Sequence, residues 1–196
     1  MASFTNKFRV TRAAGSRARW LSVLAAVLLS VLDNAGAVLY FSKEEAFEQA
    51  FGVGAAVESI PVFLTDEQVV AIEQRAKAKL DSQLFTFYEG RKDGKLLGYA
   101  AIESHTVRTQ AETLLLVLSP QGQLVKTVML AFHEPPEYQP PARWMTTLAG
   151  KKIDELVMNY GVDGVSGATL SVRAALDSAR KVLAVFQIAF PSGEAR

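Results

Sequence analysis

The chain has 196 residues, 49% of them hydrophobic, and a formal net charge of only +1 at pH 7. It contains no cysteine and two histidines. This excludes disulfides, CxxCH haem attachment, iron–sulfur ligation and a thiolate nucleophile, and argues against a histidine-rich metal site. The basic residues are dense only beside an apolar run near the start, which argues against nucleic-acid binding. A redox function would therefore need a bound organic cofactor.

The start of the chain has the composition of an export or anchoring signal. Basic residues precede the first acidic residue, Asp33, and residues 20–32 read WLSVLAAVLLSVL. This run is short for a bilayer span, and residues 35–37, Ala-Gly-Ala, have the small-x-small form of a signal-peptidase site. We therefore expect residues 1–37 to be a cleaved signal peptide, with a retained N-terminal membrane anchor as the alternative. Residues 38–196 would form one domain in the periplasm or at the extracytoplasmic face of the inner membrane.

Two helix-start patterns follow. Residues 42–52, SKEEAFEQAFG, combine a possible N-cap serine, early acidic residues and a closing glycine, which predicts a short helix. Thr65 is followed three residues later by Gln68, the spacing of a capping box. This second pattern predicts a helix from about residue 66 to residue 80.

Four strand-like segments come next, in two pairs. Residues 84–88 and 96–102 flank GRKDGK, in which Asp-Gly favours a tight hairpin turn, and residues 112–118 and 124–132 flank SPQGQ. Two hairpins predict a mostly antiparallel sheet. Because the second pair is almost continuously apolar, we expect its strands to be central and covered on both faces.

The last third of the chain contains a loop and a long helix. Residues 133–144 contain four prolines, which predicts a loop. We expect a helix around residues 152–158 and a long one from about 168 to 190, where apolar residues recur at spacings of three and four. The expected fold class is α+β: a mostly antiparallel sheet of two hairpins, packed with helices and followed by a long C-terminal helix.

Small residues mark the start of the last helix. Residues 163–171 read DGVSGATLS. Unpaired amides at a helix N-terminus bind phosphate, and Gly167 and Ala168 would let a phosphate approach the backbone. Ser166 and Ser171 could add hydroxyl donors. The alternative interpretation is structural: Ser166 or Thr169 caps the helix and Gly167 allows close packing. The residues alone leave both interpretations open.

Residues 163–169, Asp-Gly-Val-Ser-Gly-Ala-Thr, resemble the flavinylation motif Asp-x-x-Ser/Thr-Gly-Ala-Thr of FMN-binding domain proteins. This family is similar to the covalent-flavin subunits of the sodium-pumping NADH:quinone reductase and the Rnf complex. The resemblance implies that a flavin transferase joins FMN through a phosphoester to Thr169, and that residues 38–196 are an FMN-binding domain. It also implies cofactor-binding roles for the other residues of the motif and the following turn, namely Asp163, Ser166, Gly167, Ala168, Leu170 and Ser171.

The resemblance extends in pattern over residues 42–190, with one departure. Membrane-complex members often carry Glu-Thr-Pro-Gly after the last strand, whereas residues 134–137 here read Glu-Pro-Pro-Glu. This difference favours a stand-alone exported flavoprotein. We expect it to carry electrons to or from a partner such as a membrane reductase or a cytochrome, without catalytic residues or a metal of its own.

Two other functions stay open at this point. The chain could be a non-redox ligand-binding or accessory subunit of an envelope complex, or a flavin reductase with its own small substrate. Whether it is an enzyme is therefore left undecided.

Several residues outside the motif have both a functional and a structural interpretation. Glu134, Tyr138 and Trp144 could cover the isoalloxazine ring; alternatively, Trp144 fills the core and Glu134 is solvated or caps the next helix. The remaining polar candidates are expected at the surface or the edge of the sheet: His105, His133, Arg173, Arg180 and the pair Lys151-Lys152. Tyr88 and Tyr99 are expected to pack on the sheet.

Overall fold

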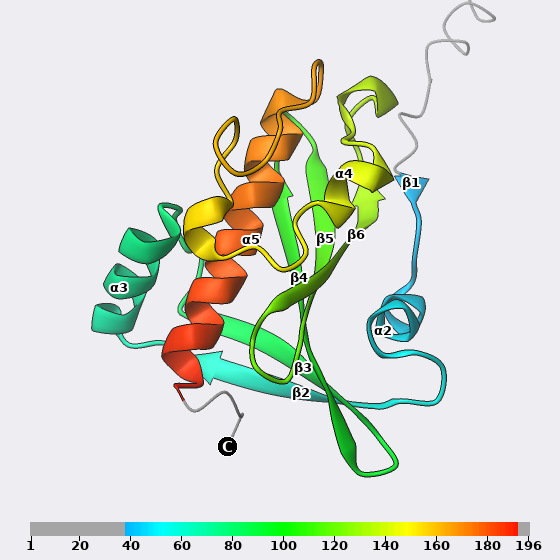
Figure 1. Cartoon of the computed structure of the whole chain (residues 1–196), viewed down its shortest axis with the longest axis vertical. Coiled ribbons are helices and arrows are strands. Elements are labelled where there is room, and N and C mark those ends of the chain that lie inside the picture. The colour runs from blue at the N-terminus through cyan, green and yellow to red at the C-terminus, as the bar shows by residue number, and fades with distance from the viewer. Residues whose placement is uncertain (1–37, 192–196) are drawn as a thin grey trace, which may run out of the picture. The chain divides into compact units, whose positions relative to one another are not determined.

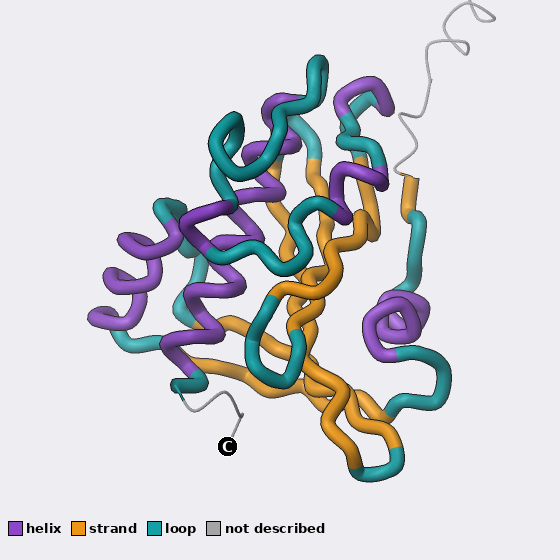
Figure 2. The backbone as a smooth tube through the Cα atoms, viewed as in Figure 1, coloured by secondary structure: helices purple, strands orange, loops and turns teal. Residues whose placement is uncertain are grey.

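The computed structural model describes residues 38–191. The expected signal peptide or anchor, residues 1–37, lies outside the described residues, as do residues 192–196. The described elements form an α+β fold of one antiparallel sheet and several helices, as Figure 2 shows. The strands are β1 (Val38–Leu39), β2 (Ala56–Phe63), β3 (Leu84–Lys92), β4 (Lys95–Thr106), β5 (Ala111–Leu118) and β6 (Leu124–Phe132). The helices are α2 (Lys43–Phe51), α3 (Asp66–Ala76), α4 (Ala142–Thr146) and α5 (Thr169–Ala189), with short 3₁₀ turns η1 (Pro136–Tyr138) and η2 (Ile153–Glu155).

The sheet has the strand order β1-β6-β5-β4-β3-β2, and all neighbours are antiparallel. Both predicted hairpins are confirmed, and Asp93 and Gly94 form the first turn with φ values of 51° and 76°. β5 is central and buried, as predicted. β6 was expected to be covered on both faces, but it neighbours the short edge strand β1 and its Val125 is 48% exposed.

Two apolar layers cover the sheet because the strand residues alternate between its faces. α5 lies across one face, with α3 beside it, and α2 lies against the other (Figure 1). Leu114 and Leu116 pack on the α5 side, whereas Leu115 and Val117 pack on the α2 side. The α5 layer includes a group of aromatic rings formed by Phe87, Tyr99, Phe186 and Phe190, whose centroids lie 5.0–5.9 Å apart. Each buried aromatic side chain stabilises the fold by roughly 1.5–3 kcal/mol.

Both predicted helix starts are confirmed. The Ser42 hydroxyl accepts from the Glu45 amide at 3.2 Å, and the Glu45 carboxylate accepts from the Ser42 amide at 2.7 Å. Thr65 and Gln68 form the same reciprocal pair in α3. The second helix is shorter than expected, because Lys77 adopts the left-handed conformation (φ 52°) and α3 ends at Ala76.

Three other predictions need correction. β2 was missed; it contains Pro61 and, among the described strands, pairs only with β3 at the edge of the sheet, where a missing amide donor is tolerated. The helix expected at residues 152–158 is only the 3₁₀ turn η2. Residues 133–144, expected to be a loop, contain η1 and the start of α4, which begins directly after Pro141. No helix within residues 38–191 is both long and apolar enough to span a membrane.

Candidate site at the start of the long helix

No side chain within residues 38–191 caps the N-terminus of α5. Gly167 has a φ of 83°, Ala168 occupies the N-cap position, and α5 begins at Thr169 and runs for 21 residues. The interpretation of Ser166 or Thr169 as a capping residue is therefore wrong, since no side chain accepts a bond from the first turn. The uncapped amides and the positive end of the helix dipole remain available for an anion.

The motif side chains divide into an exposed and a buried set. The exposed residues include Thr169, Leu170 and Ser166, and Leu170 is 46% exposed. Ala168 and Ser171 are each 1% exposed and lie under the first turn of α5. The Ser171 Oγ atom is buried without a hydrogen-bond partner among the described residues, and such a group normally acquires a water or ligand partner.

The segment before α5 is fixed by contacts with the proline-rich segment. The indole Nε1 of Trp144 donates to the carbonyl oxygen of Asp163 at 2.8 Å. A Cβ atom on Gly167 would lie 3.5 Å from the carbonyl oxygen of Glu137. A Cβ atom on Gly161 would lie only 1.9 Å from the carbonyl oxygen of Glu155, so this position excludes a side chain. The backbone of the motif is therefore held against α4 and η1.

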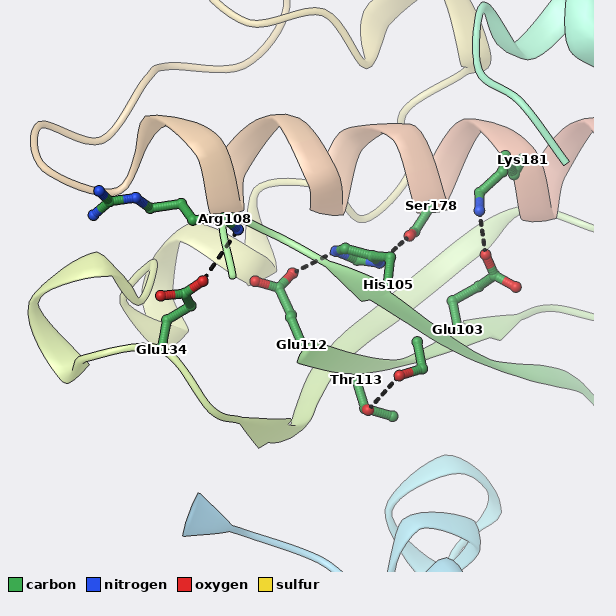
Figure 3. Close-up of polar contacts among 9 residues, drawn as sticks. Glu103, His105, Arg108, Glu112, Thr113, Glu134, Ser178 and Lys181 are labelled. Carbon is green, nitrogen blue, oxygen red and sulfur yellow. Dashed lines mark hydrogen bonds and ion pairs between the residues drawn. The ribbon is translucent and has the colours of Figure 1, made fainter. Parts of the chain in front are cut away.

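Glu134 holds the turn between β4 and β5. Its Oε1 atom accepts from the backbone amides of Arg108 (3.1 Å), Thr109 (2.7 Å) and Gln110 (2.9 Å), and Figure 3 shows the contact with Arg108. Bonds from the Thr109 and Gln110 amides hold the pKa of the Glu134 carboxyl below its usual value. Glu134 is 7% exposed, so the alternative of a solvated or helix-capping glutamate is wrong, and its contact with the flavin ring stays a prediction.

The two aromatic candidates have different surroundings. The Arg108 guanidinium lies 4.8 Å from the ring centroid of half-buried Tyr138, so a cation already covers this ring. Trp144 is 5% exposed and packs in the core.

Trp144 also lines a pocket of about 640 Å³ that reaches the motif. The pocket walls are Pro141, Arg143, Trp144, Thr147, Lys151 and residues 161–166. Lys151, expected at the surface, is half-buried in this wall, whereas Lys152 is exposed as predicted.

A row of polar side chains between α5 and the sheet was not predicted (Figure 3). His105 was expected at the surface, but its side chain is only 14% exposed and its Nδ1 lies 3.1 Å from the Ser178 Oγ. Its Nε2 lies 3.3 Å from Oε1 of fully buried Glu112. Farther along α5, Lys181 pairs with Glu103 at 2.8 Å. Glu103 and His105 are two residues apart on β4 and both face α5. This spacing is the sequence signal from which the row could have been predicted.

The two arginines of α5 also differ. Arg173 is exposed as predicted. Arg180, expected on a solvated face, is 12% exposed and joins three elements. It donates to the carbonyl oxygens of Ala76 (2.6 Å) and Leu156 (2.5 Å) and contacts Asp177. Within residues 38–191, no group of three or more acidic or histidine side chains could hold a metal.

The comparisons with known proteins give two findings. A family model described as "FMN-binding domain" matches residues 101–184, from β4 into α5. The crystal structure of Shewanella oneidensis NqrC is similar at 16% identity and a TM-score of 0.44, over 86% of this chain and 92% of that one. These values are too low to transfer a property from that protein. A comparison with curated proteins gives no match. The matched segment contains the whole of Asp163–Thr169, so the family model supports the resemblance to FMN-binding domain proteins that the motif predicted.

Proposed function

We propose that this protein is an exported electron-transfer flavoprotein whose FMN is joined through a phosphoester to Thr169. The main supporting observation is the position of Thr169: it is exposed and begins a 21-residue helix that has no side-chain cap, inside the segment that matches the FMN-binding domain. An exposed hydroxyl is accessible to a separate modifying enzyme. A phosphate on it would lie at the positive end of the helix dipole, which contributes roughly 0.3–1 kcal/mol near the surface.

The surrounding residues fit a phosphorylated flavin. The uncapped amides of the first turn can donate to phosphate oxygens, and the exposed Gly167 leaves the backbone before α5 accessible, whereas Ala168 is buried. Ser166 lies beside the exposed segment, and Ser171 provides a buried hydroxyl that lacks a partner among the described residues. Asp163 and Leu170, the other two residues predicted to bind the cofactor here, are exposed. When bound, FMN supplies the electron chemistry, and the protein supplies its position and surroundings.

A flavin transferase would attach the cofactor by transferring the FMN group of FAD to the Thr169 hydroxyl. The Thr169 oxygen forms a bond to the FMN phosphorus of FAD, the pyrophosphate P–O bond breaks, AMP leaves, and the hydroxyl proton passes to a base of the transferase. A covalent tether suits a protein that receives its cofactor after export, since a loosely held flavin would be lost outside the cell. The electron partner would be a membrane reductase or a cytochrome at the extracytoplasmic face of the inner membrane.

Intact mass and in-gel fluorescence test the proposal on protein from the envelope of a host with an exported flavin transferase. We expect the mass of the chain from Val38 plus one FMN less one water, and a denatured band that fluoresces. Thr169→Ala should be folded and colourless. Thr146→Ala, which removes another exposed threonine hydroxyl, should keep the flavin.

Two results would contradict the proposal. Flavin that stays on denatured Thr169→Ala would exclude the attachment site. A wild-type chain with the bare mass would exclude covalent flavin and favour a non-redox binding or accessory role.

A further inference from the structure

The phosphate attachment described above gives no role to most of the pocket beside the motif, although Asp163 and Ser166 belong to its wall. Its volume of about 640 Å³ lies within the roughly 300–1,000 Å³ of small-molecule sites. We propose that it receives the isoalloxazine ring of the FMN and that Arg143 and Lys151 in its wall make the flavin easier to reduce. This inference rests on the proposed attachment to Thr169.

Thr169 lies close enough to the pocket for this arrangement. Ser166 lines the pocket and precedes Thr169 by three residues. Three extended residues span at most about 11 Å, and the positive φ of Gly167 turns the chain within this interval. The ribityl chain of FMN separates its phosphate from its ring. A phosphate at the start of α5 therefore leaves the ring within reach of a pocket bounded by Ser166.

The pocket wall offers both apolar surface for the faces of a flavin ring and hydrogen-bond donors for its carbonyl edge. Trp144 and the half-buried Val165 supply apolar and aromatic surface. Residues 163–166 also line the wall, and their backbone amides donate to no acceptor within the described part of the chain. Unpaired amides suit the carbonyl edge of the ring, because carbonyl oxygens accept hydrogen bonds. The competing aromatic surface, Tyr138, is already covered by Arg108.

The charges of the wall favour the reduced flavin. Arg143 and Lys151 contribute two cations and Asp163 one carboxylate. Neither cation forms an ion pair with another residue in the 38–191 region. A reduced flavin ring carries more negative charge than an oxidised one, so nearby positive charge stabilises the reduced form.

Midpoint potentials of the mature, mass-verified holoprotein test this inference. We expect Arg143→Gln and Lys151→Gln each to lower the equilibrium constant for reduction about tenfold, which is about 30 mV for a two-electron couple. Lys152→Gln is the matched control: it removes the same charge from the neighbouring exposed position outside the pocket wall. Its potential should equal that of the wild type.

Flavin fluorescence provides a second measurement that does not depend on electron transfer. An indole in contact with the ring quenches the emission of the flavin, so Trp144→Phe should raise the emission per bound flavin while the flavin stays attached. Equal potentials in all three glutamine variants, together with unchanged emission in Trp144→Phe, would place the ring elsewhere and overturn the inference. A wild-type protein without flavin would instead overturn the proposed function, and this inference with it.

Discussion

The Nε2 atom of His105 lies 3.3 Å from Oε1 of Glu112, in the interface between α5 and the sheet. The two residues face each other across β4 and β5. Glu112 is 0% exposed, and neither of its oxygens has a well-directed hydrogen bond to another of the described residues. The imidazole is therefore mainly an electrostatic partner for a carboxylate in the interior, directly beneath the helix that begins at Thr169.

Removing His105 should expose the cost of burying Glu112. His105→Leu leaves the carboxylate without its partner, and we expect the free energy of unfolding at pH 7 to fall by about 3–5 kcal/mol. The double variant His105→Leu with Glu112→Leu should recover most of this loss, because both buried polar groups are then replaced by apolar ones. Urea unfolding of the wild type, both single variants and the double variant measures the coupling. A double variant as unstable as His105→Leu would contradict the assignment.

The pH dependence of stability should report Glu112 directly. Burial raises the pKa of the Glu112 carboxyl, and His105 partly offsets this. The native state therefore holds the proton more tightly than the unfolded chain. The resulting stabilisation is full below the ordinary pKa of 4.5 and is lost as the pH rises through the raised pKa of the native state.

Glu112→Gln removes this titration. The free energy of unfolding of Glu112→Gln minus that of the wild type should therefore increase as the pH rises from 4 to 7. Urea unfolding at both pH values measures this difference. Glu58→Gln, which changes an exposed glutamate of β2, is the control. The same pH trend in both variants would contradict the role of Glu112.

Glu134 should give the opposite pH response. Amide hydrogen bonds lower its pKa, so its contribution is present above the ordinary pKa of 4.5 and is lost as the pH falls through the lowered value. We expect the Thr109 and Gln110 amides to lose hydrogen-exchange protection in acid. In Glu134→Gln they should be less protected than in the wild type at neutral pH, and this difference should disappear in acid, where the wild-type carboxyl is protonated. Protection that is independent of pH in the wild type would show that another group holds this turn.

The sequence predicted the elements whose signals are local. The Ser42 and Thr65 capping boxes and the Asp93-Gly94 turn depend on neighbouring residues, and the structure confirms them. Residues 163–171 likewise predicted the start of a helix. The family match on the segment containing them supports the FMN assignment, whereas the role of each side chain stays a prediction.

The missed features depend on contacts between distant segments. His105 is half-buried because Ser178, 73 residues away, lies against it. Arg180 is half-buried because it joins the end of α3 to Leu156, the residue that follows η2. The edge strand β2 has alternating, mostly exposed residues, so its pairing partner decides its structure. Neither periodicity nor capping signals contain such information, and no spacing rule could have placed Arg143 and Lys151 beside the motif.

The close approach of Gly161 to Glu155 should make this glycine necessary for flavin attachment. A methyl group on residue 161 would lie 1.9 Å from a backbone oxygen, so Gly161→Ala must displace the segment that leads to Thr169. We expect a folded protein with at least several-fold lower flavin content per chain, measured by absorbance against intact mass, because the transferase would meet a displaced motif.

Gly164→Ala is the matched control for this experiment. Its added Cβ would lie 3.2 Å from the Asn159 side-chain oxygen, which can move. It should therefore keep most of its flavin. Equal flavin content in Gly161→Ala and the wild type would mean that the transferase recognises an extended peptide and that the folded geometry before α5 is unimportant. Equal loss in both alanine variants would mean that any change between residues 161 and 164 prevents attachment, whatever its steric cost.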